Sequence, residues 1–196
     1  GCEHGCIYCY ARPTHAYLGL SPGLDFETQL FAKPNAPELL KKELRKPSYK
    51  CKSIMLGANT DPYQPIERDH KITRELLKVL SDFNHPVTIT TKSDLVLRDL
   101  DILVDLAARN LVSVAVSVTT LDGKLARAME PRAPRPDKRL AALEMLNANG
   151  IPTTVMASPM IPFLNDWELE RILEAASKVG AQAAHYILLR LPLELR

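Results

Sequence analysis

Residues 86–118 read PVTITTKSDLVLRDLDILVDLAARNLVSVAVSV and contain the pattern from which the fold class follows. The two ends of this stretch, residues 86–91 and 111–118, are short runs rich in β-branched side chains, and both predict strands. Between them, residues 96–110 repeat Leu, Ile or Val at three- and four-residue steps, which predicts a helix. A strand, a helix and a second strand in this order predict a right-handed βαβ unit with parallel strands.

The same alternation extends in both directions along the chain. Further strands are expected at residues 53–57, 152–157 and 184–189. Further helices are expected at residues 36–45, 69–83, 136–149 and 166–179. Because the strand segments are mostly apolar, we expect them to be buried on both faces of a parallel sheet. The predicted fold class is therefore α/β, and this pattern alone leaves open whether the sheet is flat or curls into a barrel.

Length and composition limit the classes of protein that the chain could represent. Its 196 residues, 46% hydrophobic and 24% charged, are enough for one domain with a core. The formal net charge of +2 is too small to indicate a nucleic-acid or membrane surface, although nucleic-acid binding stays possible. We find no signal segment or membrane span, and we expect a cytoplasmic protein. The chain begins at Gly1 without Met, so we expect it to be a piece of a longer protein.

Polar residues follow four of the predicted strands. These segments read GANTDPYQPIE, TKSD, SVTTLD and SPMIPFLND, and they carry hydroxyls, amides and one lysine. Parallel strands bring their carboxyl ends to the same edge of a sheet, so the four segments can reach one ligand. The sequence therefore predicts a binding site at this edge.

Three of the four cysteines, Cys2, Cys6 and Cys9, lie in the opening segment GCEHGCIYCY. Three crowded thiols do not make a disulfide framework, and a thioredoxin-like pair would give the third no role. A zinc site completed by His4 or His15 is one interpretation, and the chain would then be a non-catalytic Cys3His module that binds a partner. An iron-sulfur cluster held by three thiolates, with one iron free to bind a small molecule, is the other. The spacing leaves both open.

The spacing Cys-x3-Cys-x2-Cys, with Tyr8 just before the last cysteine, resembles the signature of the radical S-adenosylmethionine (SAM) superfamily. Within it, GCEHGCIYCY, TKS and EPRAP resemble the spore photoproduct lyase branch and its uncharacterised relatives. The resemblance implies a partial (β/α)6 TIM-like barrel, or horseshoe, with its first strand before Gly1. It also implies that residues 1–196 are a single radical SAM core domain, cut short at the N-terminus and at the C-terminus.

The resemblance implies a chemistry as well. Cys2, Cys6 and Cys9 would ligate a 4Fe-4S cluster whose remaining iron binds the amino and carboxylate groups of SAM. Reductive cleavage of SAM would then yield a 5'-deoxyadenosyl radical, with the electron coming from an external donor of the flavodoxin or ferredoxin type. The implied protein is an enzyme with a lyase-like reaction on an unknown substrate.

The resemblance also assigns residues to SAM. The loop after the first predicted strand would hold the methionyl amine, and the next strand end would hold the carboxylate. Hydroxyls after the third strand suit the ribose and carboxylate, and an aromatic and two small or flexible residues flank the adenosyl group. Asn59, Thr60 and Asp61 would hold the amine, and Lys92 and Ser93 would hold the carboxylate. Ser117 and Thr119 would bind the ribose and carboxylate, and Tyr8, Met156 and Ala157 would flank the adenosyl group. Each could instead belong to an ordinary loop, cap or turn.

Tyr10 matches the residue that photoproduct lyases use to relay a hydrogen atom, so we predict a catalytic role for it; packing over the cluster is the alternative. The chain departs from that branch because the segment GANTD has no hydrogen-donating cysteine. Cys51 precedes the strand, and we expect it to be a buried apolar residue. For Glu130 and Arg132 of EPRAP, a local ion pair and a contact with SAM both stay open.

Overall fold

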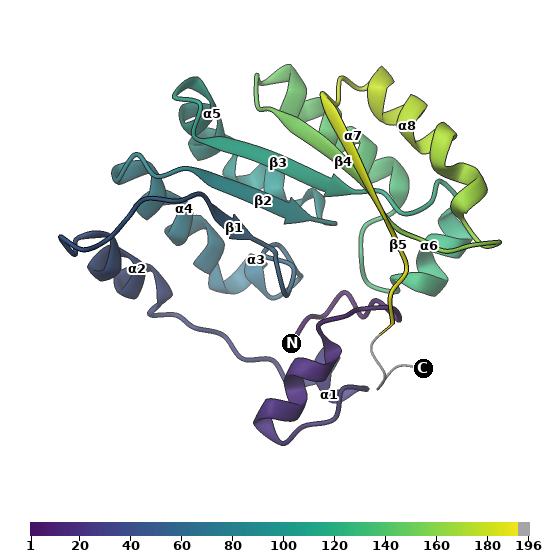
Figure 1. The fold of residues 1–196 in the computed structure, drawn as a ribbon, viewed down its shortest axis with the longest axis horizontal. Helices are drawn as coiled ribbons and strands as arrows, with labels where there is room; N and C mark the ends of the chain where they lie inside the picture. The colour runs from purple at the N-terminus through teal and green to yellow at the C-terminus, as the bar shows by residue number, and fades with distance from the viewer. Residues whose placement is uncertain (192–196) are drawn as a thin grey trace.

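The computed structural model describes residues 1–191, in which five parallel strands form a single sheet (Figure 1). The strands follow one another across the sheet in chain order, and every neighbouring pair is parallel. They are β1 (Ile54–Leu56), β2 (Val87–Thr91), β3 (Val112–Ser117), β4 (Thr153–Met160) and β5 (Ala183–Leu188). The prediction of an α/β fold with a parallel sheet is confirmed.

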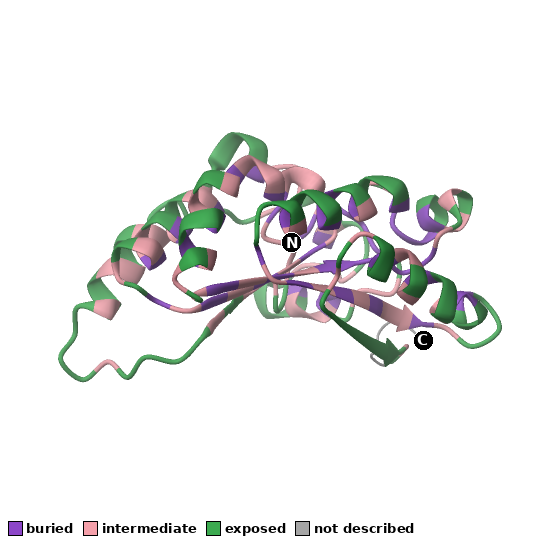
Figure 2. Cartoon of the chain, turned by 90° about the horizontal axis from the view of Figure 1, so that it is seen from above, coloured by how far each residue is buried: buried purple, intermediate pink, exposed green. Residues whose placement is uncertain are grey.

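The sequential strand order distinguishes a barrel-like sheet from a doubly wound one. A doubly wound sheet reverses direction at a switch point and carries helices on both faces. Here each right-handed crossover moves one strand further in the same direction, so the connecting helices gather on one face, as in a TIM barrel. Figure 2 shows most of the helices along one side of the sheet. The sheet is an open one, which agrees with the predicted horseshoe.

The expectation that the strands are buried on both faces is wrong. In β2, Val87, Ile89 and Thr91 are buried, whereas Thr88 and Thr90 between them are only partly buried. β5 is exposed at every position. The physical reason is that helices cover only one face, while the other lines the open interior of the horseshoe.

The main helices agree with the predicted periodicity, with two corrections at their ends. They are α2 (Ala36–Leu44), α4 (Ile72–Asp82), α5 (Leu100–Ala108), α7 (Pro136–Ala148) and α8 (Leu169–Lys178). The helix expected at 69–83 is interrupted, because Lys71 has a positive φ of 53° and separates α3 (Glu67–His70) from α4. The starts of the helices expected at 96 and 166 are 3-10 turns, η2 (Asp94–Asp99) and η3 (Asp166–Glu168).

The core lies between the sheet and this helical layer. Ile89, Val114 and Val116 from the strands pack with Leu103 and Leu143 from the helices, and all five are fully buried. Burying one such side chain contributes roughly 1.5–3 kcal/mol. This core fixes the strand ends from which the polar loops project.

Three short helical segments were not predicted from the sequence. They are η1 (Arg12–Leu18), α1 (Asp25–Thr28) and α6 (Gly123–Met129). The N-terminal segment with η1 and α1 lies below the sheet in Figure 1, near the carboxyl ends of the strands. It packs around a small separate core of Cys2, Ala11 and Phe26. The cysteine segment is therefore brought to the edge at which the polar loops gather.

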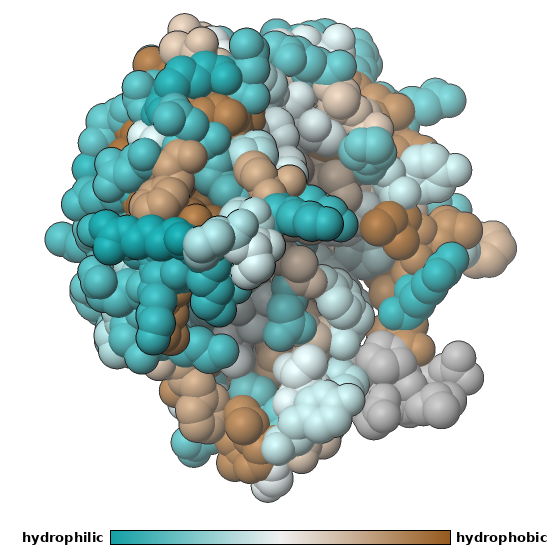
Figure 3. Space-filling model, turned by 60° about the vertical axis from the view of Figure 1, so that its left-hand side comes forward, coloured by the Kyte–Doolittle hydropathy of each residue, from teal (hydrophilic) through white to brown (hydrophobic). Residues whose placement is uncertain are grey.

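The surface mixes hydrophilic and hydrophobic residues. The face drawn in Figure 3 is mainly hydrophilic, and hydrophobic residues gather only in small areas. Among the described residues, we find no helix with the length and apolar character needed to cross a membrane.

Candidate active site

A cavity of about 630 Å³ opens at the carboxyl ends of the strands. Its lining combines the cysteine segment, the loop after β1, the ends of β2 to β4 and the segment after β5. The residues from the first two are Cys2, His4, Cys6, Tyr8, Cys9, Tyr10, Met55, Gly57, Ala58, Asn59, Thr60 and Asp61. Those from the later strands are Thr90, Thr91, Lys92, Ser117, Met156, Ser158, Pro159, Ile187, Leu188, Leu189 and Arg190.

The three clustered cysteines line this one cavity, all as free thiols. Burial raises the pKa of the Cys2 thiol to about 11 and that of the Cys6 thiol to about 12. Thiols with such high pKa values are poor nucleophiles at neutral pH, so the pair Cys6 and Cys9 does not fit a thioredoxin-like redox couple. Cys2 and Cys6 would become thiolates only when a strongly electropositive group binds them.

The backbone around Cys2 is held from the neighbouring loop by Gln64. The backbone N–H of Glu3 donates to Gln64 Oε1 at 2.9 Å, and Gln64 Nε2 donates to the carbonyl oxygen of Gly1 at 3.2 Å. One amide therefore binds both residues that flank Cys2. Because both contacts are to backbone atoms, they fix the path of the chain at this thiol.

The backbone around Cys6 is held from two other directions. Arg12 is buried, and its Nε donates to the carbonyl oxygen of Cys6 at 3.0 Å. On the other side, the N–H of Ile7 donates to Met129 at 3.0 Å, and that of Arg132 donates to His4 at 3.2 Å. The cysteine segment is thus braced before any ligand binds, as a binding loop must be if it is to hold several ligands at once.

The described residues offer no ready site for a single metal ion. No group of three or more His, Cys, Asp or Glu side chains in this part of the chain is placed so that it could hold one. The zinc interpretation, with Cys2, Cys6, Cys9 and His4 around one ion, therefore finds no support in the arrangement of these side chains. His15, the other candidate, instead lies 3.0 Å from the carbonyl oxygen of Gln29.

The cavity does have features that fit a larger polar group. Both ring nitrogens of buried His4, and the hydroxyl oxygen of Ser158, are buried without a hydrogen-bond partner in the described part of the chain. His4 Nε2 lies 3.3 Å from Asp61 Oδ2, which is an ion-pair distance without hydrogen-bond geometry. Buried polar atoms without partners are rare in proteins, and these two residues face the cavity. Three thiols with such neighbours suit the soft irons of a cluster and a polar ligand beside it.

The loop after β1 passes very close to β2. Gly57 has a φ of 96°, and a Cβ on this residue would overlap the carbonyl oxygen of Thr90. Only glycine fits such a turn without strain. Asn59, Thr60 and Asp61, which follow this turn, all line the cavity.

Asp61 joins this loop to β2 and to the cysteine segment. It accepts hydrogen bonds from Thr91 Oγ1 and the Lys92 N–H, both at 2.7 Å, and from the Tyr63 N–H at 2.8 Å. Burial raises the pKa of Asp61, but the charge of nearby His4 and these hydrogen bonds outweigh burial and bring the pKa to about 2. Asp61 is thus a carboxylate whose acceptor positions are largely used within the protein.

Lys92 extends from the end of β2 into the cavity. Its Nζ donates to Ser117 Oγ at 2.9 Å, lies 3.7 Å from Glu130 Oε1 and is 5.9 Å from the centre of the Tyr8 ring. Two strand ends and the cysteine segment therefore meet at this ammonium group. Its charge and position suit a carboxylate ligand.

Glu130 is the fully buried carboxylate behind Lys92. Arg139, Tyr8 and Thr119 all donate hydrogen bonds to it. Burial raises the pKa of Glu130, but the charges of Lys92 and Arg139 outweigh burial and keep the pKa below its usual value. The charge of Glu130 is thus shared between a structural arginine and the lysine of the cavity.

Three of the residues predicted to contact SAM do not line the cavity. Ser93 is buried, and its Oγ accepts a hydrogen bond from the Leu95 N–H at the start of η2. Thr119 donates to Glu130 at 3.1 Å, and Ala157 is buried in the main core. Ser117 and Met156, by contrast, are at the cavity. Tyr10, predicted to be catalytic, is a lining residue that is 61% exposed, and its hydroxyl donates to the carbonyl of Ala58.

The structure also corrects one expectation, excludes one of two open alternatives and adds residues. Cys51 is exposed and outside the cavity lining, so its prediction as a buried residue is wrong; it lies in the irregular segment before β1, away from any core. Glu130 and Arg132 pair with Arg139 and Glu27 respectively, and not with each other. Sequence reasoning missed Gln64 and Arg139, because their roles depend on tertiary contacts: Gln64 binds the backbone of Gly1 and Glu3, and Arg139 pairs with Glu130.

Comparison with known proteins connects this geometry to a family. The chain matches the family described as the Radical SAM superfamily over residues 1–176. It is 40% identical over 183 residues to an uncharacterized protein of Mycobacterium tuberculosis, a match that covers 92% of this chain and 54% of that protein. An uncharacterized protein of Methanocaldococcus jannaschii is 35% identical over 168 residues, with 86% and 60% covered. The chain thus spans about half the length of the curated relatives it matches.

Two solved structures share the fold at low sequence identity. Spore photoproduct lyase complexed with dinucleoside spore photoproduct gives a TM-score of 0.68 at 15% identity, covering 97% of this chain and 55% of that one. Streptococcus suis SuiB bound to S-adenosylmethionine gives 0.66 at 17% identity, covering 96% and 38%. At these identities, the likeness concerns the fold.

Proposed function

This chain belongs to the radical SAM superfamily, and we propose that it binds a 4Fe-4S cluster through Cys2, Cys6 and Cys9 and cleaves SAM reductively. The observation that carries the proposal is that these three thiols share one cavity with Lys92 and the loop after β1. When bound, the cluster would supply the electron that breaks a carbon–sulfur bond of SAM, and the products would be methionine and a 5'-deoxyadenosyl radical.

The chain's own residues would bind and orient SAM. Lys92, held by Ser117, would pair with the methionyl carboxylate. Asn59 and Thr60 would accept hydrogen bonds from the amino group, while Asp61 would act mainly by holding their loop against β2. Tyr8 and Met156 would border the adenosyl group. Each assignment rests on the position of the side chain in the cavity lining.

We further propose an external electron donor of the flavodoxin or ferredoxin type, and a lyase-like reaction at a substrate that enters past Tyr10. Two proteins of this fold, spore photoproduct lyase and SuiB, were solved with dinucleoside spore photoproduct and with the precursor peptide SuiA respectively. Since fold alone does not select a substrate, this likeness does not choose between such classes. The loop 57–61 has no cysteine, so a photoproduct-type hydrogen return from a thiol at that loop is not part of the proposal.

Anaerobic reconstitution of the full-length protein with iron and sulfide tests the cluster. We expect a brown protein with iron and sulfide in the proportion of a 4Fe-4S cluster, and production of 5'-deoxyadenosine from SAM after reduction. Replacing Cys2, Cys6 or Cys9 with Ala should abolish both. Cys51→Ala is the matched control, because this thiol is exposed and outside the cavity lining, and it should change neither.

A colourless protein that carried one zinc ion would contradict the cluster and would support the Cys3His alternative. Full cluster content in Cys2→Ala would show that the ligand assignment is wrong. Both results are read from metal analysis and do not require the substrate.

A further inference from the structure

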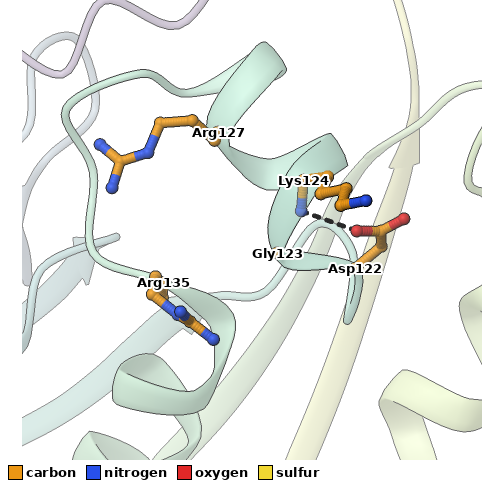
Figure 4. Close-up of a pocket in the computed structure, with 5 residues that line it drawn as sticks. All are labelled: Asp122, Gly123, Lys124, Arg127 and Arg135. Atoms are coloured by element: carbon orange, nitrogen blue, oxygen red, sulfur yellow. Dashed lines mark hydrogen bonds between the residues drawn. The ribbon is translucent and has the colours of Figure 1, made fainter.

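A second cavity, of about 780 Å³, lies between α6 and the start of α7. It is lined by Asp122, Gly123, Lys124, Arg127 and Arg135, and it shares no lining residue with the cavity of the cysteines. Figure 4 shows Lys124 and Arg127 on α6, with Arg135 at the beginning of α7 on the other side of the hollow. Cationic side chains from two separate helices thus line one space.

The charges around this cavity are unbalanced. Three lining side chains are cationic and one, Asp122, is anionic. Asp122 Oδ1 is engaged by the N–H groups of Lys124 and Leu125, at 2.7 and 3.3 Å, where it caps α6. Asp137, which is outside the lining, pairs with Arg135 Nε at 3.0 Å and reduces the positive charge without cancelling it.

Several cationic donors are left without a partner. Arg127 uses one terminal nitrogen, NH1, for the carbonyl of Pro131 at 2.6 Å. Within the described residues, Lys124 Nζ, Arg127 NH2 and both terminal nitrogens of Arg135 make no hydrogen bond or ion pair. Lys124, Arg127 and Arg135 are exposed, so these donors are hydrated and accessible to a ligand, and an anion between the three like charges would reduce their mutual repulsion.

The geometry and charge select a kind of anion. Guanidinium groups present paired N–H donors that match the oxygens of phosphate, and arginine is favoured where phosphate is recognised. We propose that this cavity binds a phosphate group, with Arg127 and Arg135 donating to its oxygens from the two helices and Lys124 balancing its remaining charge. This goes beyond the proposed function, because it requires neither the cluster nor SAM.

The position of the cavity connects it to the cysteine segment. α6 ends at Met129, whose carbonyl accepts the N–H of Ile7. Arg132, between α6 and α7, donates its N–H to the carbonyl of His4. A phosphate held between α6 and α7 would therefore bind the part of the fold that also braces the cysteines. The phosphate is either a free anion or a group on a larger molecule.

Isothermal titration calorimetry of the full-length protein, without iron or SAM, tests the site with inorganic pyrophosphate and with adenosine monophosphate. Arg127→Gln with Arg135→Gln should weaken binding at least tenfold. The control is Arg45→Gln with Arg68→Gln, two exposed arginines outside the cavity that remove the same charge, and it should change the affinity by less than twofold. The amide resonance of Gly123 should shift on binding in the parent protein.

The two probes distinguish the sources of the phosphate. Tighter binding of pyrophosphate would support a free anion, and tighter binding of adenosine monophosphate would support a phosphate carried by a nucleoside. The proposal would be overturned if neither probe bound, or if the control variant lost as much affinity as the Arg127→Gln and Arg135→Gln double variant. Since the assay uses protein without iron, failure here leaves the cluster proposal intact, and failure of the cluster leaves this test intact.

Discussion

Glu130 and Arg139 form an ion pair from which water is excluded, with side chains 0% and 1% exposed. Arg139 also donates to the carbonyl oxygens of Ser117 at 3.0 Å and Pro134 at 2.7 Å. It therefore connects the end of β3, the EPRAP segment and α7. The same carboxylate binds Tyr8 and Thr119 and lies 3.7 Å from Lys92, so the pair connects the packing of the fold to the candidate SAM site.

Removing one member of this pair should be strongly destabilising. Glu130→Gln keeps the shape but leaves the arginine charge buried without a counter-charge, and we expect a loss of about 3–5 kcal/mol in the free energy of unfolding. Urea unfolding followed by circular dichroism measures this. The double variant Glu130→Gln with Arg139→Met should lose less than the sum of the two single losses. Strict additivity would show that the two side chains do not act as a pair.

Gln64 should control how firmly the cysteine segment keeps its iron. Gln64→Leu preserves bulk but removes both backbone contacts beside Cys2, so we expect iron to be lost several times faster during anaerobic gel filtration of the reconstituted protein. Gln64→Glu, which can accept from Glu3 but cannot donate to Gly1, should be intermediate. Gln29→Leu, at an exposed position, is the control. Equal iron retention in Gln64→Leu and the control would show that Gln64 does not position the cysteine segment.

The sequence predicts those parts of the fold that depend on residues close together in the chain, and it does not predict those that depend on tertiary contacts. The βαβ alternation is local, so the strands, the main helices and the parallel sheet could be predicted from residues 86–118 and the similar segments around them. The break at Lys71 could not, since nothing in the periodicity of residues 69–83 marks a residue with positive φ. One-sided burial of β2 was missed because Thr88 and Thr90 face the open interior, which depends on the strand order.

The candidate site likewise combines residues that short motifs predict with residues whose roles depend on tertiary contacts. The three clustered cysteines, Tyr8, Lys92 and the 57–61 loop belong to short motifs, and the structure places all of them at one cavity. The roles of Gln64 and Arg139, by contrast, depend on tertiary contacts with the cysteine segment and with the end of β3. Ser93 and Thr119 have the hydroxyls that a ligand would need, but these atoms bond to the protein itself. Hydroxyl chemistry alone could not distinguish the two uses.

Lys92 should contribute to SAM affinity and not to cluster assembly. Lys92→Met keeps the apolar stem but removes the charged donor, and we expect SAM to bind roughly 10- to 150-fold more weakly, corresponding to about 1.5–3 kcal/mol. Equilibrium dialysis with the reconstituted protein measures the affinity, and the iron content should equal that of the parent. Lys78→Met, at an exposed position on α4, is the control. Unchanged SAM affinity in Lys92→Met would show that Lys92 does not bind SAM and makes only a polar contact with Ser117.

Asp61 should stabilise the fold in a manner that depends on pH. All three groups that bond to it, Thr91 Oγ1 and the N–H groups of Tyr63 and Lys92, are donors, so Asp61→Asn would place an amide N–H₂ against some of them. The pKa of Asp61 is lowered in the folded state to about 2, from an ordinary value of 3.8. A carboxyl with a lowered folded pKa stabilises the protein above its unfolded pKa, and this contribution disappears as the pH falls toward the folded pKa.

We therefore expect Asp61→Asn to cost roughly 2 kcal/mol of unfolding free energy at pH 7, from the size of that pKa difference. The gap between the parent and Asp61→Asn should narrow as the pH is lowered below about 4, because the carboxyl of the unfolded parent is then protonated while that of the folded parent is protonated only near pH 2. Urea unfolding at a series of pH values measures both effects. Asp69→Asn, at an exposed position, should stay within about 0.5 kcal/mol of the parent throughout. If the difference in unfolding free energy between the parent and Asp61→Asn stayed constant from neutral to acid pH, the destabilisation would come from shape and hydrogen bonding alone. The negative charge of Asp61 would then not contribute to stability.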